Sequence, residues 1–249
     1  MFSAKKTALI TGGATRIGHE IVLFLAKLGW DIAIHYNTSE EGAEALAQKL
    51  LPRKAQIFSA NFTDPDQVEQ LIPAIYKTMG PISLLVNNAA YFANDTLATL
   101  SEGHLNKHMQ VNIHAPALLM QNFAVHAPNG SNIINMVDYC VCKLPNKFLS
   151  YTLSKSALWT LTQMAASELA PNIRVNAIGP GFALKGEHMD PIKYARSEQD
   201  SPLGHSTSPD EICRTIGYII DTKSITGQLL LLAGGRHLSN HEFYTADAI

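Results

Sequence analysis

The feature that most constrains the fold of this sequence is a regular alternation of short apolar runs with longer stretches of helical periodicity. The runs are continuously apolar, which is typical of parallel strands covered on both faces. The predicted strands are 7–11, 31–36, 55–60, 83–88, 132–137, 173–178 and 228–233, and the predicted helices are 16–29, 39–51, 65–79, about 103–126, 151–170 and about 208–221. This alternation predicts an α/β fold with a doubly wound, seven-stranded parallel sheet and helices on both of its faces.

The number of domains follows from length and from the absence of breaks. The 249 residues suit one large α/β domain, and we find no internal repeat or linker, so we predict a single domain over 1–249. Two polar segments break the pattern, at about 182–207 and at 236–249. Because an irregular insert after a strand's carboxyl end lies beside the ligand crevice of an open sheet, we interpret 182–207 as a substrate loop and 236–249 as a tail.

Composition argues against several classes of protein. The formal net charge of −2 gives no reason to expect a nucleic acid as a partner. No apolar run approaches the roughly 20 residues of a membrane helix, and we see no signal peptide, so we expect a cytoplasmic protein without a membrane partner. Cys140 and Cys142 are expected to alternate on one face of an extended stretch as small apolar residues. His104 and His108 lack a third ligand and are expected to be solvated, so we predict no metal site.

The stretch TGGATRIG, residues 11–18, follows the first predicted strand and opens a helix, which is the context of a dinucleotide-binding loop and of a Rossmann domain. Glycines in this loop let the backbone approach a pyrophosphate, whose charge then lies at the helix N-terminus. Arg16 adds a planar fork of donors that suits a phosphate. The predicted cofactor contacts here are Gly12, Arg16, Ile17 and Gly18.

The end of the second predicted strand indicates which dinucleotide is bound. An NAD site usually has an acidic residue here for the ribose 2′-hydroxyl, and none occurs before Glu40. With Arg16, the neutral donors after this strand favour the 2′-phosphate of NADPH/NADP. The predicted contacts are His35, Tyr36, Asn37 and Ser39. In the alternative interpretation Ser39 only caps a helix and Arg16 is a surface ion-pair residue.

Tyr151 and Lys155 are four residues apart at the start of a predicted helix and share a face. At roughly 4 Å and an effective dielectric constant near 20, their attraction is about 4 kcal/mol, or about three pKa units. Such a shift would bring a phenol from about 10 toward about 7, where general acid–base catalysis works well. The alternative is a simple surface pair on a helix.

With these motifs, the sequence resembles the short-chain dehydrogenase/reductase family over nearly its whole length. The matching elements are the 11–18 loop, NNAA at 87–90, Asn112 in MQVNIHAP, YTLSK at 151–155, GPG at 179–181 and GG at 234–235. The resemblance implies that Tyr151 is the general acid, that Lys155 lowers its pKa and binds the nicotinamide ribose, and that Asn112 holds a water in a proton relay. It also implies a homotetramer and cofactor contacts at Asn61, Phe62, Asn88, Ala89, Ala90, Pro180 and Gly181.

Asp138 departs from the family pattern, which usually has a serine thirteen residues before the tyrosine. A serine hydroxyl can donate to a carbonyl oxygen that becomes an alkoxide, whereas an ionised carboxylate would repel that charge. The sequence shares this aspartate with one branch that it resembles, the pteridine reductases and the bacterial dihydromonapterin and dihydrofolate reductases of short-chain type. The TGxxxRxG loop, HY followed by a serine, and GGRHL at 234–238 strengthen this resemblance.

The resemblance predicts NADPH-dependent reduction of a pterin or dihydrofolate-like ring. Hydride would reach an imine carbon, Tyr151 with Asp138 would protonate the ring nitrogen, and Phe92 would stack on the ring. Two alternatives remain: a carbonyl reductase, such as an oxoacyl-thioester reductase, in which Asp138 is incidental, and a non-catalytic NADP-binding sensor. Asp95 and Glu102 are candidates for a second acid, but capping or solvent-facing roles fit them better.

Overall fold

The computed structural model describes residues 6–184 and 201–239. The strands are β1 (Thr7–Ile10), β2 (Asp31–Tyr36), β3 (Ala55–Ser59), β4 (Leu84–Asn87), β5 (Ser131–Met136), β6 (Ile173–Pro180) and β7 (Leu229–Leu232). The helices are α1 (Arg16–Lys27), α2 (Glu40–Lys49), α3 (Pro65–Met79), α4 (Glu102–Met109), α5 (Ala115–His126), α6 (Leu149–Glu168) and α8 (Pro209–Asp221). Shorter turns are the π-helix η1 (Gln110–His114) and the 3₁₀ helices η2 (Tyr139–Val141) and η3 (Arg236–Leu238).

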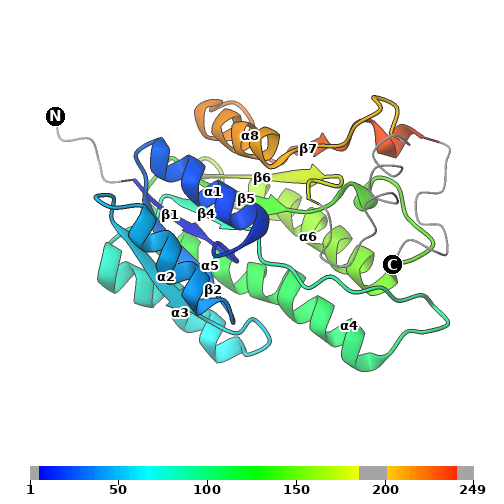
Figure 1. Cartoon of the computed structure of the whole chain (residues 1–249), viewed down its shortest axis with the longest axis horizontal. Coiled ribbons are helices and arrows are strands. Elements are labelled where there is room, and N and C mark those ends of the chain that lie inside the picture. The colour runs from blue at the N-terminus through cyan, green and yellow to red at the C-terminus, as the bar shows by residue number, and fades with distance from the viewer. Residues whose placement is uncertain (1–5, 185–200, 240–249) are drawn as a thin grey trace.

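The seven strands form one parallel sheet in the order β3-β2-β1-β4-β5-β6-β7, so the predicted fold class is confirmed. Alternate strand residues face two separate hydrophobic clusters, as Ile10 and Leu9 do on β1. One cluster packs α1, α2 and α8 on one face of the sheet, and the other packs α3, α5 and α6 on the opposite face (Figure 1). The strand order reverses between β1 and β4, which places the ligand crevice at their carboxyl ends.

Side chains cap the first turn of two helices. Asp64 caps α3 by accepting from the backbone N–H groups of Asp66 and Gln67, and Ser208 forms a capping box with Glu211 at the start of α8. Ser39 makes no such bond to α2. Within the described residues no helix has the length and apolar character to span a membrane.

The helix predicted at about 103–126 is divided by the π-helix η1. Pro116 has no N–H, so it cannot donate to the carbonyl of Asn112 four residues earlier. The widened turn accommodates this missing donor and lies at the position of Asn112. Pro116 therefore indicates in the sequence that the helix is interrupted, although the apolar periodicity alone does not reveal the interruption.

One expectation about the irregular segments is wrong. Cys140 and Cys142 do not share a face, because the chain turns into η2 directly after Asp138; Cys140 is buried and Cys142 is exposed. The polar segment expected as a tail from 236 begins with the 3₁₀ turn η3, in which Arg236 is fully buried. Of the expected substrate loop at 182–207, residues 185–200 lie outside the described part of the chain, as do residues 240–249 of the tail.

Candidate active site

The loop between β1 and α1 is shaped by glycines at its close contacts. Gly12 has a φ of +62°, a region that side chains disfavour. At Gly18 a Cβ would lie 2.0 Å from the carbonyl oxygen of Gly12, so only glycine fits there. The loop thus folds tightly against the first turn of α1 and presents its backbone toward the crevice. Arg16 at the start of α1 is exposed and has a φ of +53°, a left-handed backbone conformation that glycine adopts more readily than arginine.

The Thr11 hydroxyl joins the same loop to the end of β4, a contact that the sequence motif does not predict. The Thr11 Oγ1 accepts from the backbone N–H groups of Asn88 (2.9 Å) and Ala89 (3.0 Å). In return, the Asn88 side-chain amide donates to the carbonyls of Thr11 (2.9 Å) and Gly12 (3.2 Å). The predicted cofactor residues Asn88 and Ala89 therefore lie beside the loop, and the Asn88 side chain holds its shape. Thr11 was missed because its residue type alone carries no signal.

His35 was predicted as a polar donor to the cofactor, but its ring is buried under the loop and is 2% exposed. Its Nδ1 accepts from the Gly12 N–H at 3.0 Å, and its Nε2 lies 3.0 Å from the carbonyl of Ala60. These partners require a neutral ring protonated on Nε2, and burial lowers the pKa of His35 from 6.5 to about 4. The ring also stacks on Phe62 with centroids 4.2 Å apart. The contact expected from the His35 side chain is corrected: His35 and Phe62 support the loop from below.

Near the end of β2 and β3, some predicted cofactor residues hydrogen-bond within the protein, whereas others are accessible to a ligand. The Tyr36 hydroxyl donates to Glu40 at 2.8 Å, and this bond, with burial, raises the pKa of Tyr36. Asn37 is exposed and Ser39 is half-buried, so both can meet a ligand. The Asn61 side-chain oxygen accepts from the N–H and the hydroxyl of Thr63. Asn61 thus stabilises the turn into α3.

Asp138 and Tyr151 meet at the carboxyl end of β5. The Tyr151 hydroxyl donates to one Asp138 carboxyl oxygen at 3.1 Å, and the backbone N–H of Cys140 donates to the other at 2.9 Å. Burial raises the pKa of Asp138, and the hydrogen bonds and the nearby Lys155 ammonium oppose that rise. The structure thus brings together the two predicted proton-handling residues, and it favours the protonated carboxyl more than an exposed aspartate would.

Lys155 lies one turn further along α6, but its direct partner differs from the one expected. Its ammonium donates to the carbonyl of Met136 at 2.7 Å and lies 5.7 Å from the centroid of the Tyr151 ring. Burial lowers the pKa of Lys155 from 10.5 to about 8, while Asp138 opposes that shift. The i,i+4 spacing thus places the ammonium over the Tyr151 ring, and Asp138 joins the two residues as a third ionisable group.

Asn112 is fully buried at the π-helix η1. Its side-chain oxygen accepts from the Tyr91 N–H at 2.8 Å, and its amide donates to the Tyr91 carbonyl and to the Ser154 Oγ, each at 2.9 Å. Asn112 therefore ties α6 to the loop after β4. Its predicted part in a proton relay stays a prediction, and the bonds in hand give it a positioning role.

Phe92 stands at the mouth of the crevice with 56% of its surface exposed. Its ring stacks on Phe148 with centroids 4.8 Å apart and meets the Tyr151 ring edge-on at 4.7 Å. A flat ligand could stack on the open face of Phe92 next to the Tyr151 hydroxyl. Ala90 is exposed in the same loop. β6 ends at Pro180 and is followed by Gly181. The preceding Gly179 lies beside Asp138, since a Cβ on it would be 3.4 Å from the Asp138 carbonyl oxygen.

Two residues for which the sequence analysis predicts no catalytic or metal-binding role, His108 and Asp95, are buried next to this site. His108 is fully buried rather than solvated: its Nε2 accepts from the Ala93 N–H at 3.3 Å, and its Nδ1 lies 2.8 Å from the His104 carbonyl. Burial lowers its pKa, which keeps the ring neutral. Asp95 is 2% exposed and accepts from the Ser150 N–H at 2.9 Å at the start of α6. The capping role foreseen for Asp95 is confirmed, although the helix it caps lies far away in the sequence.

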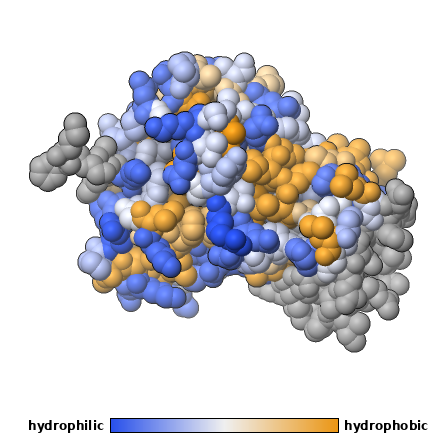
Figure 2. All heavy atoms as spheres, turned by 90° about the horizontal axis from the view of Figure 1, so that it is seen from above, coloured by the Kyte–Doolittle hydropathy of each residue, from blue (hydrophilic) through white to orange (hydrophobic). Residues whose placement is uncertain are grey.

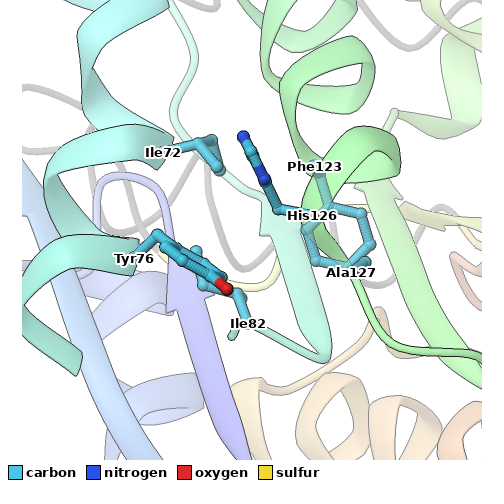
Figure 3. Close-up of a pocket in the computed structure, with 6 residues that line it drawn as sticks. All are labelled: Ile72, Tyr76, Ile82, Phe123, His126 and Ala127. Carbon is cyan, nitrogen blue, oxygen red and sulfur yellow. The ribbon is translucent and has the colours of Figure 1, made fainter. Parts of the chain in front are cut away.

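A small surface pocket lies away from these residues, between α3 and α5 (Figure 3). It is lined by Ile72, Tyr76, Ile82, Phe123, His126 and Ala127. Ile82 precedes β4 and Ala127 precedes β5, so this pocket is at the amino ends of the strands, opposite the crevice. In residues 6–184 and 201–239, no cluster of three His, Cys, Asp or Glu side chains could hold a metal ion.

A glycine loop at the first strand and a Tyr–Lys–Asp group at the fifth, with its tyrosine and lysine buried, define a nucleotide-dependent oxidoreductase. The chain belongs to the short-chain dehydrogenase/reductase family, since the family model described as enoyl-(acyl carrier protein) reductase matches residues 12–237.

Several relatives carry narrower names. A dihydromonapterin reductase of Escherichia coli O6:K15:H31 is 30% identical over 238 residues, covering 92% of this chain and 96% of that protein. The crystal structure of FolM alternative dihydrofolate reductase 1 from Brucella canis, complexed with NADP, matches with a TM-score of 0.92 and 38% identity, covering 98% of this chain and 97% of that chain. A blue fluorescent protein from a metagenomic library, in complex with NADPH, matches with a TM-score of 0.86 and 30% identity over 92% of this chain and 97% of that one.

Proposed function

We propose that this protein is an NADPH-dependent reductase of a pterin or dihydrofolate-like ring. One observation carries the proposal: the Tyr151 hydroxyl donates to the Asp138 carboxyl at 3.1 Å, directly beside the exposed ring of Phe92. Desolvation raises the pKa of the Asp138 carboxyl, so it takes up a proton more readily than an exposed aspartate and can pass that proton toward a ring nitrogen, and a flat aromatic face suits a pterin. The relatives named for dihydromonapterin and dihydrofolate support the same substrate class.

The residues at the β1–α1 loop fit NADPH. The bare backbone around Gly12 and Gly18 leaves no side chain between the loop and a pyrophosphate at the N-terminus of α1. The exposed Arg16 and Asn37, with Ser39, are our candidates to hold the 2′-phosphate, and the backbone of Ala89 and Ala90 is our candidate to border the bound cofactor. Similar structures that contain NADP or NADPH support this choice of cofactor.

In this proposal the side chains of the chain move one proton and orient the substrate. NADPH, when bound, supplies the hydride that reduces an imine carbon of the ring. The Tyr151 hydroxyl, or the Asp138 carboxyl through it, gives the proton to the adjacent ring nitrogen. The positive charge of the Lys155 ammonium then stabilises the tyrosinate. Phe92 stacks on the substrate ring and excludes water from it.

The test is steady-state turnover of dihydromonapterin, dihydrobiopterin and dihydrofolate with NADPH. We expect at least one of them to be reduced, and Asp138→Ser to lose at least tenfold in kcat on it. Simple ketones and an oxoacyl thioester are the comparison substrates. Turnover of those alone, increased by Asp138→Ser, would contradict the proposal and identify a carbonyl reductase in which Asp138 is incidental.

We also propose a homotetramer of single-domain subunits that works in the cytoplasm, with 182–207 as the substrate loop. Two surfaces support the assembly. β7 is an edge strand of half-buried leucines, with the exposed Leu203 and Leu238 nearby. In Figure 2, hydrophobic side chains gather at the centre and right of the face, on the side where β7 and η3 lie in Figure 1.

The second surface is on α5 and α6. Leu153 and Met164 are eleven residues apart on α6, hence on one face, and they are 49% and 64% exposed. Val125 on α5 is 73% exposed. Sedimentation of the wild type should give four chains, and Leu153→Glu with Met164→Glu should give two. A monomeric wild type at micromolar concentration would contradict the assembly without touching the proposed reaction.

A further inference from the structure

The first turn of α6, which carries Tyr151, is capped by residues from a different part of the chain. Phe148 occupies the N-cap position, but its side chain is apolar and makes no capping bond, and its backbone is left-handed with a φ of +59°. The free N–H groups at a helix start need acceptors. Here the Phe148 N–H donates to the Asn94 side chain at 3.2 Å, and the Leu149 N–H donates to the Asp95 carbonyl at 3.1 Å.

Asp95 makes the strongest part of this cap. One of its carboxyl oxygens accepts from the Ser150 N–H at 2.9 Å, and the other accepts a short hydrogen bond from the Ser150 hydroxyl. The carboxylate is almost completely buried and lies at the positive end of the longest described helix. Ser150 directly precedes Tyr151, so these bonds fix the backbone from which the tyrosine projects.

The segment that supplies the cap is the segment that carries Phe92. Its backbone is hydrogen-bonded by Asn112 at Tyr91 and by His108 at Ala93. Its other end is bonded to α6 through Asp95. Phe92 in turn packs on Phe148 and on the edge of Tyr151. The aromatic face and the proton donor are therefore held to each other by a loop that spans residues 91–95.

We propose that Asp95 is a positioning residue, which sets the Tyr151 hydroxyl toward Asp138 by capping α6 and couples that pose to Phe92. Asp95 acts through Ser150 and through the backbone of α6. The inference rests on the proposed function only in that the protein reduces some substrate with NADPH. It is independent of which ring or carbonyl is reduced.

The experiment compares Asp95→Ala and Asp95→Asn with Ser208→Ala, a matched control that removes the cap of α8, a helix without predicted site residues. With any substrate that the wild type reduces, Asp95→Ala should lower kcat at least tenfold, leave KM within about threefold, and leave NADPH binding within threefold by fluorescence titration. Asp95→Asn can still accept from the Ser150 N–H, so it should recover kcat to within threefold of the wild type. Ser208→Ala should lower the melting temperature without this loss of kcat.

A second readout does not need turnover. Hydrogen exchange at residues 148–151 should accelerate in Asp95→Ala and stay unchanged in Ser208→Ala, where exchange should accelerate at the start of α8 instead. If Asp95→Ala does not fold, Ser150→Ala, which removes only the hydroxyl bond, should lower kcat about threefold to fivefold. Equal kcat values for folded Asp95→Ala and wild type, or equal losses in Asp95→Ala and Ser208→Ala, would overturn the proposal. A wild type that reduces carbonyls but no pterin would overturn the proposed substrate and leave this comparison fully measurable.

Discussion

The two walls of the crevice are built on different physical principles. The cofactor wall, at the β1–α1 loop, is held by neutral groups: the Thr11 hydroxyl, the Asn88 amide and the uncharged His35 ring. The substrate wall, at η2 and the start of α6, encloses ionisable side chains: Asp138 and Lys155. The first wall is a scaffold whose shape is fixed, and the second is a place where protons can be taken up and given away.

The pKa shifts follow this division. Burial lowers the pKa of His35 to about 4, so near neutral pH the cofactor wall does not titrate. Burial raises the pKa of Asp138 and lowers that of Lys155 to about 8, which brings both toward the range in which an enzyme works. Perturbed carboxyl and amino groups that share a site are expensive to bury, and they indicate chemistry more than stability.

The largest effect should come from removing the proton donor of the substrate wall. In Tyr151→Phe we expect kcat to fall about a thousandfold, because general acid catalysis contributes on the order of 10²–10⁴. NADPH affinity should weaken by less than about tenfold, since at most one hydrogen bond to the cofactor is lost. Stopped-flow reduction and fluorescence titration separate the two. Tyr218→Phe, at an exposed tyrosine of α8, is the control. A Tyr151→Phe enzyme that keeps more than a tenth of kcat would show that the proton comes from elsewhere.

We expect protonation of His35 in the cofactor wall to lower the free energy of unfolding at acidic pH. Its folded pKa of about 4 is depressed below the unfolded 6.5, so between these values the unfolded chain binds a proton that the folded chain does not. Stability should therefore fall as the pH drops through this window, by about 3 kcal/mol in full. Urea unfolding at pH 7 and 4.5 measures it. His35→Gln should be less stable at pH 7 but lose less on acidification, whereas His126→Gln, at an exposed histidine, should behave as the wild type. Equal acid losses in all three proteins would contradict this cause.

Much of this arrangement could be predicted from the sequence because it depends on local patterns. The strand and helix order follows from apolar periodicity, and Asp138, Tyr151 and Lys155 follow from spacing within one continuous stretch. Burial, by contrast, depends on which distant segments meet. His35 is the last residue but one of β2, where the sequence predicts a ligand contact, but the loop after β1 closes over its side chain. His104 and His108 lack a third metal ligand in the sequence, which predicted solvated side chains, and only the fold places the Ala93 N–H against His108.

The cap of α6 shows the same limit more sharply. Sequence rules look for a capping residue next to the helix, and here the position holds Phe148. The acceptors come from Asn94 and Asp95, more than fifty residues earlier, and no local rule connects the two segments. The partners are known only once β4 and β5 are neighbours in the sheet.

The smallest expected effect is at Arg16, where two variants separate the cost of its strained backbone from its contribution to NADPH binding. Its φ of +53° costs about 1–2 kcal/mol for a side chain, whereas glycine adopts it freely but loses about 0.5–1 kcal/mol of stability through the flexibility of the unfolded chain. Arg16→Gly should therefore change the free energy of unfolding by less than about 1 kcal/mol, in the stabilising direction. Arg16→Ala removes the same charge and keeps the strain. Both variants should weaken NADPH about tenfold and leave NADH unchanged, because an exposed guanidinium on a phosphate contributes about one charge-assisted hydrogen bond. If both variants bind NADPH as the wild type does, Arg16 is only a surface residue, and the preference for NADPH has to come from Asn37, Thr38 and Ser39.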